Sequence, residues 1–223
     1  MLWGVDYTTH DIPVFLLAPS ESFQSWAKYF ELFRILNHYP ILIICDDNTA
    51  LKTATRLKFP KAKIQTCYNH FKESVRRDLR VRTDVTYKGF SLGIDRILSK
   101  KRSQRDLNGQ LQRLYERNEN NLVCVKIIAD IERNKAEFLA FTGVKGAPAT
   151  NNMIECYNSH LEARLNGIRS FESFNHAQLW LNGYILKRRY TRFVGCTGKF
   201  KKLNGCFALE KSKKENVVLP TFF

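Results

Sequence analysis

The 223-residue sequence lacks the features of several protein classes. It contains no run of 18 apolar residues, so we expect no membrane-spanning helix and no membrane partner. Its first ten residues, MLWGVDYTTH, have neither a basic start nor a long apolar stretch, so we do not expect them to act as a secretory signal. The six cysteines are irregularly spaced, which predicts free thiols in a reducing compartment rather than a disulfide framework.

Acidic residues are also scarce. The 21 Asp and Glu residues stand against 36 Lys and Arg residues, which gives a net charge of +15 and a pI near 9.7. Residues 71–105 hold 11 basic and 4 acidic residues, and residues 186–214 hold 10 and 1. Such basic blocks are typical of a surface that binds a polyanion, most simply nucleic acid. Solvated faces without a partner are the structural alternative.

The hydrophobic pattern predicts an α/β fold that begins with antiparallel strands. The segments LWGVDY (2–7) and PVFLLAP (13–19) are expected to form a hairpin, and an amphipathic helix follows Ser20. The run ILIIC (41–45) is continuously apolar, as in a buried central strand. The further predicted elements are helices over 49–59, 151–166 and 173–190, a strand over 62–68 and a mostly helical stretch over 71–141.

Three acidic residues occupy positions that suit a catalytic site. Asp46 and Asp47 directly follow the predicted strand ILIIC, and such strand ends carry the sites of many α/β proteins. Glu155 lies near the start of a predicted helix, on the same side as Asn158. Each acid has a structural alternative, because an aspartate can cap the following helix and the helix dipole favours a glutamate in the first turn.

Together, the carboxylates and the basic blocks match the requirements of phosphodiester chemistry. Two divalent metal ions would be held by Asp and Glu oxygens, one to activate the attacking water or 3′-hydroxyl and one to stabilise the leaving oxygen. Basic residues would offset the repulsion between the acids and the phosphates. We therefore expect two divalent metal ions and a nucleic-acid substrate.

Two long blocks resemble the catalytic core of the Mutator-like (bacterial MULE-type) DDE transposases. IICDDNTALKTATRLKFPKAKIQTCYNHFKESVRRDL resembles the block with the family's second catalytic Asp, and it includes a Cys-x-x-His pair, here Cys67 and His70. ATNNMIECYNSHLEARLNGIRSFESFNHAQLWLNGYILKRR resembles the family's Glu block, whose motif falls here on Thr150 or Asn151, Asn152, Glu155 and Asn158. GVDYTTHDIPVFLLAPSESFQSWAKYF matches the early hairpin and first helix.

The resemblance implies a ribonuclease-H-like fold, a mixed sheet flanked by helices, with an all-α insertion between the second Asp and the Glu. It also implies cleavage of DNA and strand transfer of transposon ends into target DNA with two Mg²⁺ or Mn²⁺ ions, by a homo-oligomer in a synaptic complex. Asp46 would be the second metal-binding acid and Glu155 the third, and Asp47, where the family usually has Gly, is a further candidate ligand. The implied parts are the start of the core over 1–70, the insertion over 71–148, the closing core helices over 149–190 and a basic tail over 191–223.

The family's first catalytic Asp lies on a strand that the early hairpin does not include. We expect this strand to lie upstream of Met1, so that the chain is an N-terminally truncated piece of a transposase. Within the chain, Asp6 is the alternative first acid and Asp11 a weaker one. Two other functions therefore stay open: a catalytically inactive DNA-binding remnant, and a ribonuclease-H-like nuclease that uses Asp6.

The basic blocks supply the predicted contacts to the DNA backbone. A spacing of four residues would place Lys72, Arg76 and Arg80 on one face of a helix. The predicted DNA-binding residues are Lys72, Arg76, Arg77, Arg80, Arg164, Lys187, Arg188, Arg189 and Arg192.

A bound zinc ion is not expected. Cys67 and His70 have half of a zinc pattern, and Cys156 and His160 could complete a Cys₂His₂ set, but no other feature of the sequence supports zinc. The expected location is the cytoplasm, in association with the nucleoid, in a prokaryote, and the nucleus in a eukaryote.

Overall fold

The protein is described by a computed structural model that covers residues 1–213, 215 and 217–219. Residues 214, 216 and 220–223 of the expected basic tail lie outside the described residues. Helices predominate, and the strands form two short sheets, so the predicted α/β class is confirmed. None of the described helices is long and apolar enough to cross a membrane.

The chain divides into two compact units. Unit 1 comprises Met1–His38 and Asn152–Phe223, and unit 2 comprises Tyr39–Asn151. These limits differ from the boundaries after residues 70 and 148 that the resemblance implies, because the strand pair that follows residue 40 packs with the helical segment.

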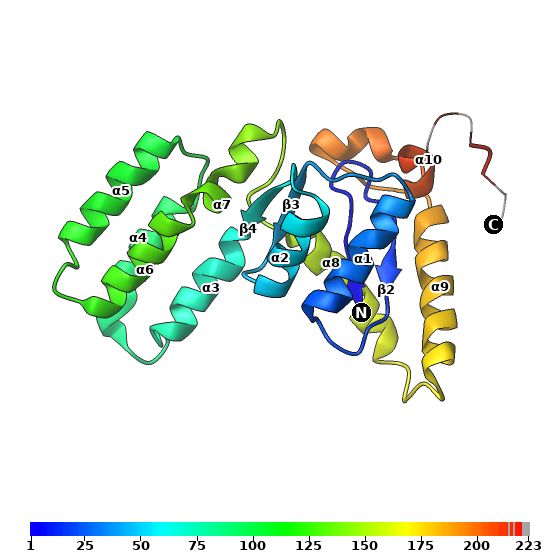
Figure 1. The fold of residues 1–223 in the computed structure, drawn as a ribbon, viewed down its shortest axis with the longest axis horizontal. Helices are drawn as coiled ribbons and strands as arrows, with labels where there is room; N and C mark the ends of the chain where they lie inside the picture. Colours follow the sequence, from blue (N-terminus) through cyan, green and yellow to red (C-terminus); the bar gives the residue numbers. More distant parts are fainter. Residues whose placement is uncertain (214, 216, 220–223) are drawn as a thin grey trace. The chain divides into compact units, whose positions relative to one another are not determined.

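Unit 1 combines a short hairpin with helices (Figure 1). β1 and β2 pair in antiparallel fashion, with Leu2 opposite Leu16. The predicted hairpin is therefore confirmed, but each strand is only two residues long, because a hydrogen-bonded turn occupies the chain from Asp6 to Asp11. The elements of unit 1 are β1 (Leu2–Trp3), β2 (Phe15–Leu16), α1 (Phe23–Ile35), α8 (Asn152–Leu165), α9 (Phe174–Tyr190), η3 (Gly198–Leu203) and α10 (Ala208–Ser212).

Serine caps set the start of two helices in unit 1. Ser22, rather than Ser20, caps α1, and its Oγ accepts a hydrogen bond from the N–H of Ser25 at 3.2 Å. Ser173 caps α9 in the same way, through the N–H of His176 at 3.1 Å. Helices α8 and α9 occupy the two spans that the sequence predicts, so these predictions are confirmed.

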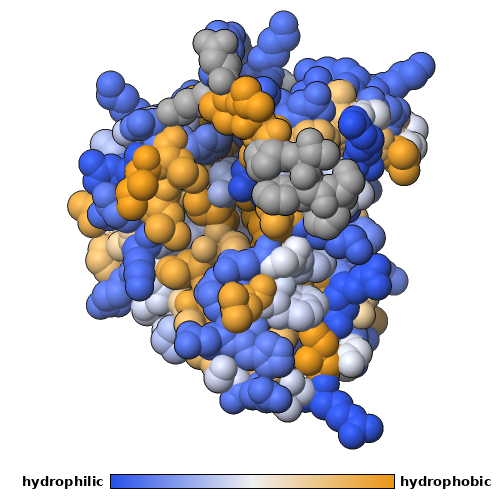
Figure 2. Space-filling view, turned by 90° about the vertical axis from the view of Figure 1, so that its right-hand side faces the viewer, coloured by the Kyte–Doolittle hydropathy of each residue, from blue (hydrophilic) through white to orange (hydrophobic). Residues whose placement is uncertain are grey.

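A small buried cluster joins α8 and α9 to the hairpin segment. Ile12, Tyr157 of α8 and Ile185 of α9 are buried together, and the ring of Trp3 meets Tyr157 edge-on. Figure 2 shows hydrophobic side chains that also reach the surface on the side of α9, between hydrophilic neighbours. Leu179 of α9, which is exposed, is one of the apolar residues on the surface of unit 1.

Unit 2 contains a parallel strand pair and a set of helices. β3 and β4 are joined by α2 and pair in register, with Cys45 opposite Thr66. Residues 42–44 of β3 are half-buried, and among the described residues β3 pairs with β4 alone, so the expected buried central strand is not observed. The elements of unit 2 are β3 (Leu42–Cys45), α2 (Thr49–Lys58), β4 (Lys63–Thr66), α3 (Tyr68–Asp78), η1 (Val85–Tyr87), α4 (Lys88–Ile97), α5 (Gln104–Glu116), α6 (Leu122–Arg133), α7 (Lys135–Leu139) and η2 (Ala140–Gly143).

The helices of unit 2 enclose an apolar core of their own. Apolar residues from α3 to α7 pack together, among them Ile94, Leu111, Ile131 and Phe138, each of which is at most 2% exposed. The mostly helical stretch expected over 71–141 is therefore confirmed.

Asn48 caps α2, and neither preceding aspartate does. The Oδ1 atom of Asn48 accepts a hydrogen bond from the N–H of Leu51 at 3.0 Å. The structural alternative for Asp46 and Asp47, a helix cap, is therefore wrong. Because Asn48 satisfies the helix end, both carboxylates can take other partners.

Candidate catalytic carboxylates and basic surface

Asp46 lies at the carboxyl edge of the parallel strand pair. β3 ends at Cys45 and β4 ends at Thr66, and the N–H of Cys67 donates to the carbonyl of Cys45 at 2.8 Å. The residues that follow the two strands, Asp46 and Cys67, therefore lie at the same edge of the sheet. The side chain of Asp46 is 53% exposed, so its carboxylate is accessible to a ligand or a metal ion.

Two side chains of unit 2 contact one oxygen of this carboxylate. His70 Nδ1, in the first turn of α3, lies 2.8 Å from Asp46 Oδ1, and Asn151 Nδ2 donates to the same oxygen at 2.9 Å. Cys67 Sγ in turn donates to Asn151 Oδ1 at 3.0 Å. Burial raises the pKa of the Cys67 thiol, so at neutral pH it is a protonated donor. Asp46 Oδ2 receives no hydrogen bond from the residues that the structure describes.

Asp47 has a different partner. Its side chain is 76% exposed, and its Oδ1 atom lies 2.5 Å from the ammonium of Lys52, on α2. That ammonium also donates to Thr66 Oγ1 at 3.1 Å and to Glu137 Oε2 at 2.6 Å. The two adjacent aspartates therefore enter separate hydrogen-bond networks.

Glu155 stands half-buried in the first turn of α8, in unit 1. The next turn fixes this helix to the hairpin segment: the hydroxyl of Tyr157 donates to the carbonyl of His10 at 2.9 Å, and Asn158 Oδ1 accepts from Trp3 Nε1 at 2.8 Å. Asn158, which the resemblance marks as a motif residue, therefore orients the helix that carries Glu155. The other motif residue of unit 1, Asn152, is the exposed first residue of α8.

The two alternatives for the first acid have partners within unit 1. Asp6 Oδ1 accepts hydrogen bonds from the N–H and hydroxyl groups of both Thr8 and Thr9, at 2.7–2.9 Å. Burial by itself would raise the pKa of Asp6, but these hydrogen bonds outweigh it and lower the pKa. Asp11 is fully buried, and its two oxygens accept from Nε and Nη2 of Arg189, each at 2.8 Å. Asp6 thus orders the hairpin turn, and the geometry does not support Asp11 as a metal ligand.

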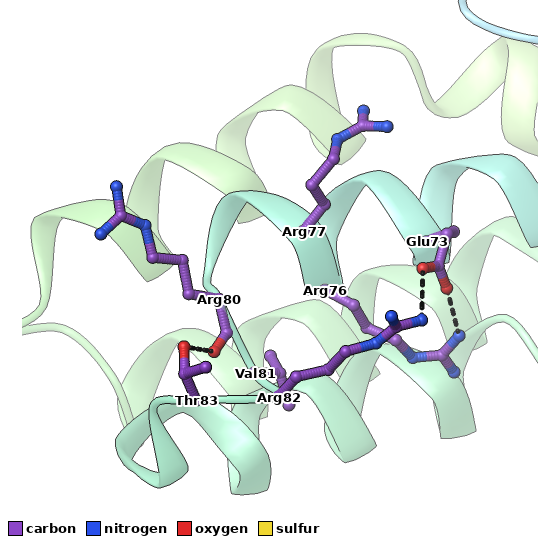
Figure 3. A pocket seen from close by; sticks show the side chains of 7 residues that line it. All are labelled: Glu73, Arg76, Arg77, Arg80, Val81, Arg82 and Thr83. Atoms are coloured by element: carbon purple, nitrogen blue, oxygen red, sulfur yellow. Dashed lines mark hydrogen bonds and ion pairs between the residues drawn. The ribbon is translucent and has the colours of Figure 1, made fainter.

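Four arginines line a pocket of about 600 Å³ at the end of α3 (Figure 3). Arg76 makes a bidentate contact with Asp95, at 2.7 and 2.8 Å, and it also meets Glu73. Arg82 lies 3.7 Å from Glu73. Arg77 and Arg80 are exposed, point away from Glu73 in Figure 3 and have no acidic partner among the described residues.

The expected alignment of three basic residues on one helix face is wrong. α3 ends at Asp78, and Arg80 has a φ of 50°, in the left-handed region. Lys72 and Arg76 share the helix, whereas Arg80 lies beyond it in the following turn. The helix ends two residues before Arg80, which the spacing of the basic residues did not predict.

The basic residues predicted on unit 1 have varied surroundings. Arg189 pairs with buried Asp11, so the structure gives it an internal partner in place of the DNA phosphate that the sequence predicted. The Arg188 guanidinium lies 4.5 Å from the centre of the Tyr157 ring. Arg192 donates to the carbonyl of Gly205 at 2.5 Å and lies over the ring of Phe207. The exposed pair Arg164 and Lys187 stay predicted DNA contacts.

Sequence reasoning missed one residue of this site and the contacts of another. Asn151 is one of the candidate motif positions of the Glu block, yet only the fold shows that its amide contacts Asp46 and Cys67. Lys52 stands on an ordinary amphipathic helix and gave no signal, because its partner Glu137 is 85 residues away in the sequence.

The family model described as "Transposase, Mutator family" matches residues 8–181 of the chain. The chain therefore belongs to the Mutator family of transposases, as the sequence motifs predicted, and this membership assigns it to DNA transposition. A comparison with curated proteins found no match.

Proposed function

We propose that this chain is the catalytic core of a DDE-type transposase, which cuts DNA and transfers strands with divalent metal ions. The observation that carries the proposal is the carboxylate of Asp46, which lies exposed at the carboxyl edge of the strand pair, with one oxygen hydrogen-bonded by Asn151 and close to His70. Family membership supports the reaction class. A ribonuclease-H-like arrangement of the sheet is part of the proposal, and the parallel pair β3–β4 with its connecting helix is compatible with it.

The residues that would hold the metal ions are Asp46 and Glu155. Oxygen donors suit Mg²⁺ and Mn²⁺, and Asp46 offers an oxygen, Oδ2, that makes no hydrogen bond within the described residues. Asn151, which fixes the other oxygen of Asp46, precedes Glu155 by four residues in the chain. When bound, two such ions would activate the attacking oxygen and stabilise the leaving oxygen.

The chain's own residues would orient the reacting groups. The hydrogen bond from Asn151 limits the rotation of the Asp46 carboxylate, and Cys67 fixes the amide orientation of Asn151. Asn158 would help to orient Glu155 indirectly, because its hydrogen bond with Trp3 holds α8, the helix that carries Glu155. Groups that orient metal ligands in this way typically increase metal affinity, because the ligands are already in place when the ion binds.

Nicking of supercoiled plasmid in Mn²⁺ tests the proposal. The wild-type chain should nick the plasmid, and Asp46→Asn and Glu155→Gln should each abolish nicking. Glu162→Gln, an exposed glutamate on the same helix, is the matched control and should retain activity. Joining of a 3′ end to a second duplex distinguishes a transposase from a ribonuclease-H-like nuclease. Full activity in both active-site variants would contradict the proposal.

A catalytically inactive DNA-binding remnant is the second candidate. The contacts of Asp6, the alternative first acid, favour this candidate. One oxygen of Asp6 already accepts hydrogen bonds from Thr8 and Thr9, which makes it less available to a metal ion. A chain that binds DNA and cuts nothing, with or without Mn²⁺, would identify the remnant.

DNA backbone binding by the arginine pocket is also proposed. Among the four arginines, Arg77 and Arg80 lack acidic partners in the described residues, so they are the ones expected to meet phosphates. Arg76 is neutralised by Asp95 and serves as an internal control.

Salt-dependent fluorescence anisotropy with a labelled duplex tests this surface. Each lost phosphate contact should reduce the slope of log affinity against log salt by about 0.9. The double change Arg77→Gln/Arg80→Gln should therefore lower the slope by about 2, and Arg76→Gln should leave it nearly unchanged. An equal loss in the Arg76 variant would show that the pocket does not act in this way.

Assembly of several copies on paired transposon ends is part of the same proposal. Sedimentation of the chain with and without end-containing DNA measures it. The nucleoid of a prokaryote, or the nucleus of a eukaryote, stays the proposed location.

A further inference from the structure

Lys52 is a buried lysine whose ammonium is fully hydrogen-bonded. The residue is 6% exposed, and Nζ donates to Asp47 Oδ1 at 2.5 Å, Glu137 Oε2 at 2.6 Å and Thr66 Oγ1 at 3.1 Å. An ammonium has three N–H donors, so all three are used. Burial would lower the pKa of Lys52, but the two carboxylates outweigh it and raise the pKa, so the group stays charged.

The three partners come from three different segments of unit 2. Asp47 belongs to the loop after β3, Thr66 ends β4, and Glu137 lies in α7, near the end of the helical segment. Glu137 also accepts hydrogen bonds from Arg56 and from the hydroxyl of Thr66. One buried ammonium therefore connects the loop that carries both aspartates to α7.

Further contacts dock the end of the helical segment on β4. Gln65 is fully buried, and its side chain donates to the carbonyl of Phe138 at 3.3 Å and accepts from the N–H of Phe141 at 3.0 Å. The hydroxyl of Tyr68 donates to the same Phe138 carbonyl at 2.6 Å. Because α7 is held in this way, Glu137 presents a fixed charge to Lys52.

The two adjacent aspartates differ in their partners, because Asp47 pairs with Lys52 and Asp46 does not. A cation that bound Asp47 would have to displace an ammonium 2.5 Å away, or share the carboxylate with it, and the two positive charges would repel each other. Asp46 has no basic lysine or arginine partner among the described residues, and its Oδ2 makes no hydrogen bond there. Of these two aspartates, Asp46 is therefore the better suited to be a metal ligand, because no ammonium lies beside its carboxylate among the described residues.

We propose that Lys52 is a positioning residue that keeps Asp47 as its counter-ion, so that Asp46 alone of the pair binds metal, and that it ties this loop to α7. The metal-binding half of the inference rests on the proposed function. The link between the loop and α7 does not, because it concerns contacts within unit 2.

Hydrogen–deuterium exchange tests the link without any metal. In Lys52→Met, amides of residues 46–48 and 135–139 should exchange at least about 10-fold faster, while those of α5 stay unchanged. Lys126→Met, which alters an exposed lysine of the same unit, should change neither segment. Unchanged exchange in both segments, or a uniform increase throughout unit 2, would overturn the proposal.

Asp47→Asn and Glu137→Gln keep the link testable if Lys52→Met fails to fold. Asp47 is largely exposed, so its amide variant is expected to fold. Asp47→Asn should speed exchange at 46–48 alone, and Glu137→Gln should speed it at 135–139. Protection at wild-type levels in both variants would overturn the link.

Mn²⁺ binding, measured by calorimetry, tests the choice between the aspartates. Asp46→Asn should weaken binding at least about 10-fold, and Asp47→Asn by less than about 3-fold. In the Lys52→Met background, Asp47 is released, so adding Asp47→Asn should now weaken binding by more than about 3-fold. Equal losses for Asp46→Asn and Asp47→Asn in the wild-type background would overturn the choice. If the wild-type chain bound no Mn²⁺, the proposed function would fail, and the exchange experiment would still decide the link.

Discussion

Replacing Arg189 with methionine should destabilise unit 1 without weakening the DNA affinity of the folded protein. Arg189 makes a bidentate ion pair with Asp11, which is completely buried and also accepts a hydrogen bond from Ser212. The Arg189 side chain is 23% exposed, so solvent screens the pair only weakly. Methionine would leave a buried carboxylate with the Ser212 hydroxyl as its one remaining side-chain partner among the described residues.

The magnitude follows from the burial of this pair. Removing one partner of a buried ion pair costs about 3–5 kcal/mol, because the other charge stays buried and uncompensated. For a chain of this size, each kcal/mol shifts the melting temperature by about 2–4 °C, so Arg189→Met should lower it by about 6–20 °C. Lys187→Met, two residues earlier on the exposed side of α9, should shift it by less than about 2 °C.

A double-mutant cycle by urea unfolding measures the coupling between Asp11 and Arg189. If the pair is the cause, Asp11→Ala/Arg189→Met should cost less than the sum of the single changes, by about 1–3 kcal/mol. Additive losses, or equal destabilisation by Lys187→Met, would refute the reasoning. A marked loss of DNA affinity in folded Arg189→Met would instead indicate that Arg189 contacts DNA.

Three further predictions follow from local contacts. Asn48→Ala should destabilise unit 2 by about 1 kcal/mol in urea unfolding, because it removes the α2 cap, and a loss near zero would show that another group takes over. The pKa of Asp6 is lowered in the folded chain, so its stabilising effect is present above its usual value of 3.8 and disappears as the pH falls through the folded pKa. Asp6→Asn should therefore cost more stability at pH 7 than at pH 2.5, and equal losses would contradict this. Iodoacetamide should modify exposed Cys156 in the folded protein but not Cys45, whose thiol is buried with a pKa raised to about 12, and mass spectrometry of the labelled peptides distinguishes the two.

Local sequence signals predicted the framework of the candidate site well. The apolar run before Asp46, the proline-bounded helix after it and the following strand are observed as β3, α2 and β4, and the structure places Asp46 and Cys67 at one edge of this strand pair. The Glu block predicted both α8, with Glu155 near its start, and α9, and both helices are observed. These features depend on neighbours within a few residues, which sequence patterns capture.

Side-chain pairings between distant parts of the chain could not be predicted in the same way. Asp11 and Arg189 are 178 residues apart, and Lys52 and Glu137 are 85 apart. Each of these charged residues, taken alone, suits a solvated surface, and the two basic ones also suit a phosphate contact, so the sequence favoured DNA binding for Arg189. Only the packing of the fold shows that two of these four residues, Asp11 and Lys52, are almost completely buried.

The lengths of individual strands and helices could not be predicted either, because they depend on the local backbone conformation. The sequence predicted long strands at the start, but the Asp6 side chain organises a turn with the following threonines and ends β1 early. Likewise, the left-handed conformation of Arg80 ends the basic face of α3, although arginine itself carries no signal for such a conformation.

The most direct test of the central claim is a Mn²⁺ titration of the wild-type chain, Asp46→Asn, Glu155→Gln and the control Glu162→Gln. Paramagnetic relaxation of water protons reports the bound ion. The account predicts that wild type and Glu162→Gln bind Mn²⁺ with the same affinity, and that the other two variants each bind at least about 10-fold more weakly. Wild-type affinity in both Asp46→Asn and Glu155→Gln would contradict the assignment of these acids as metal ligands.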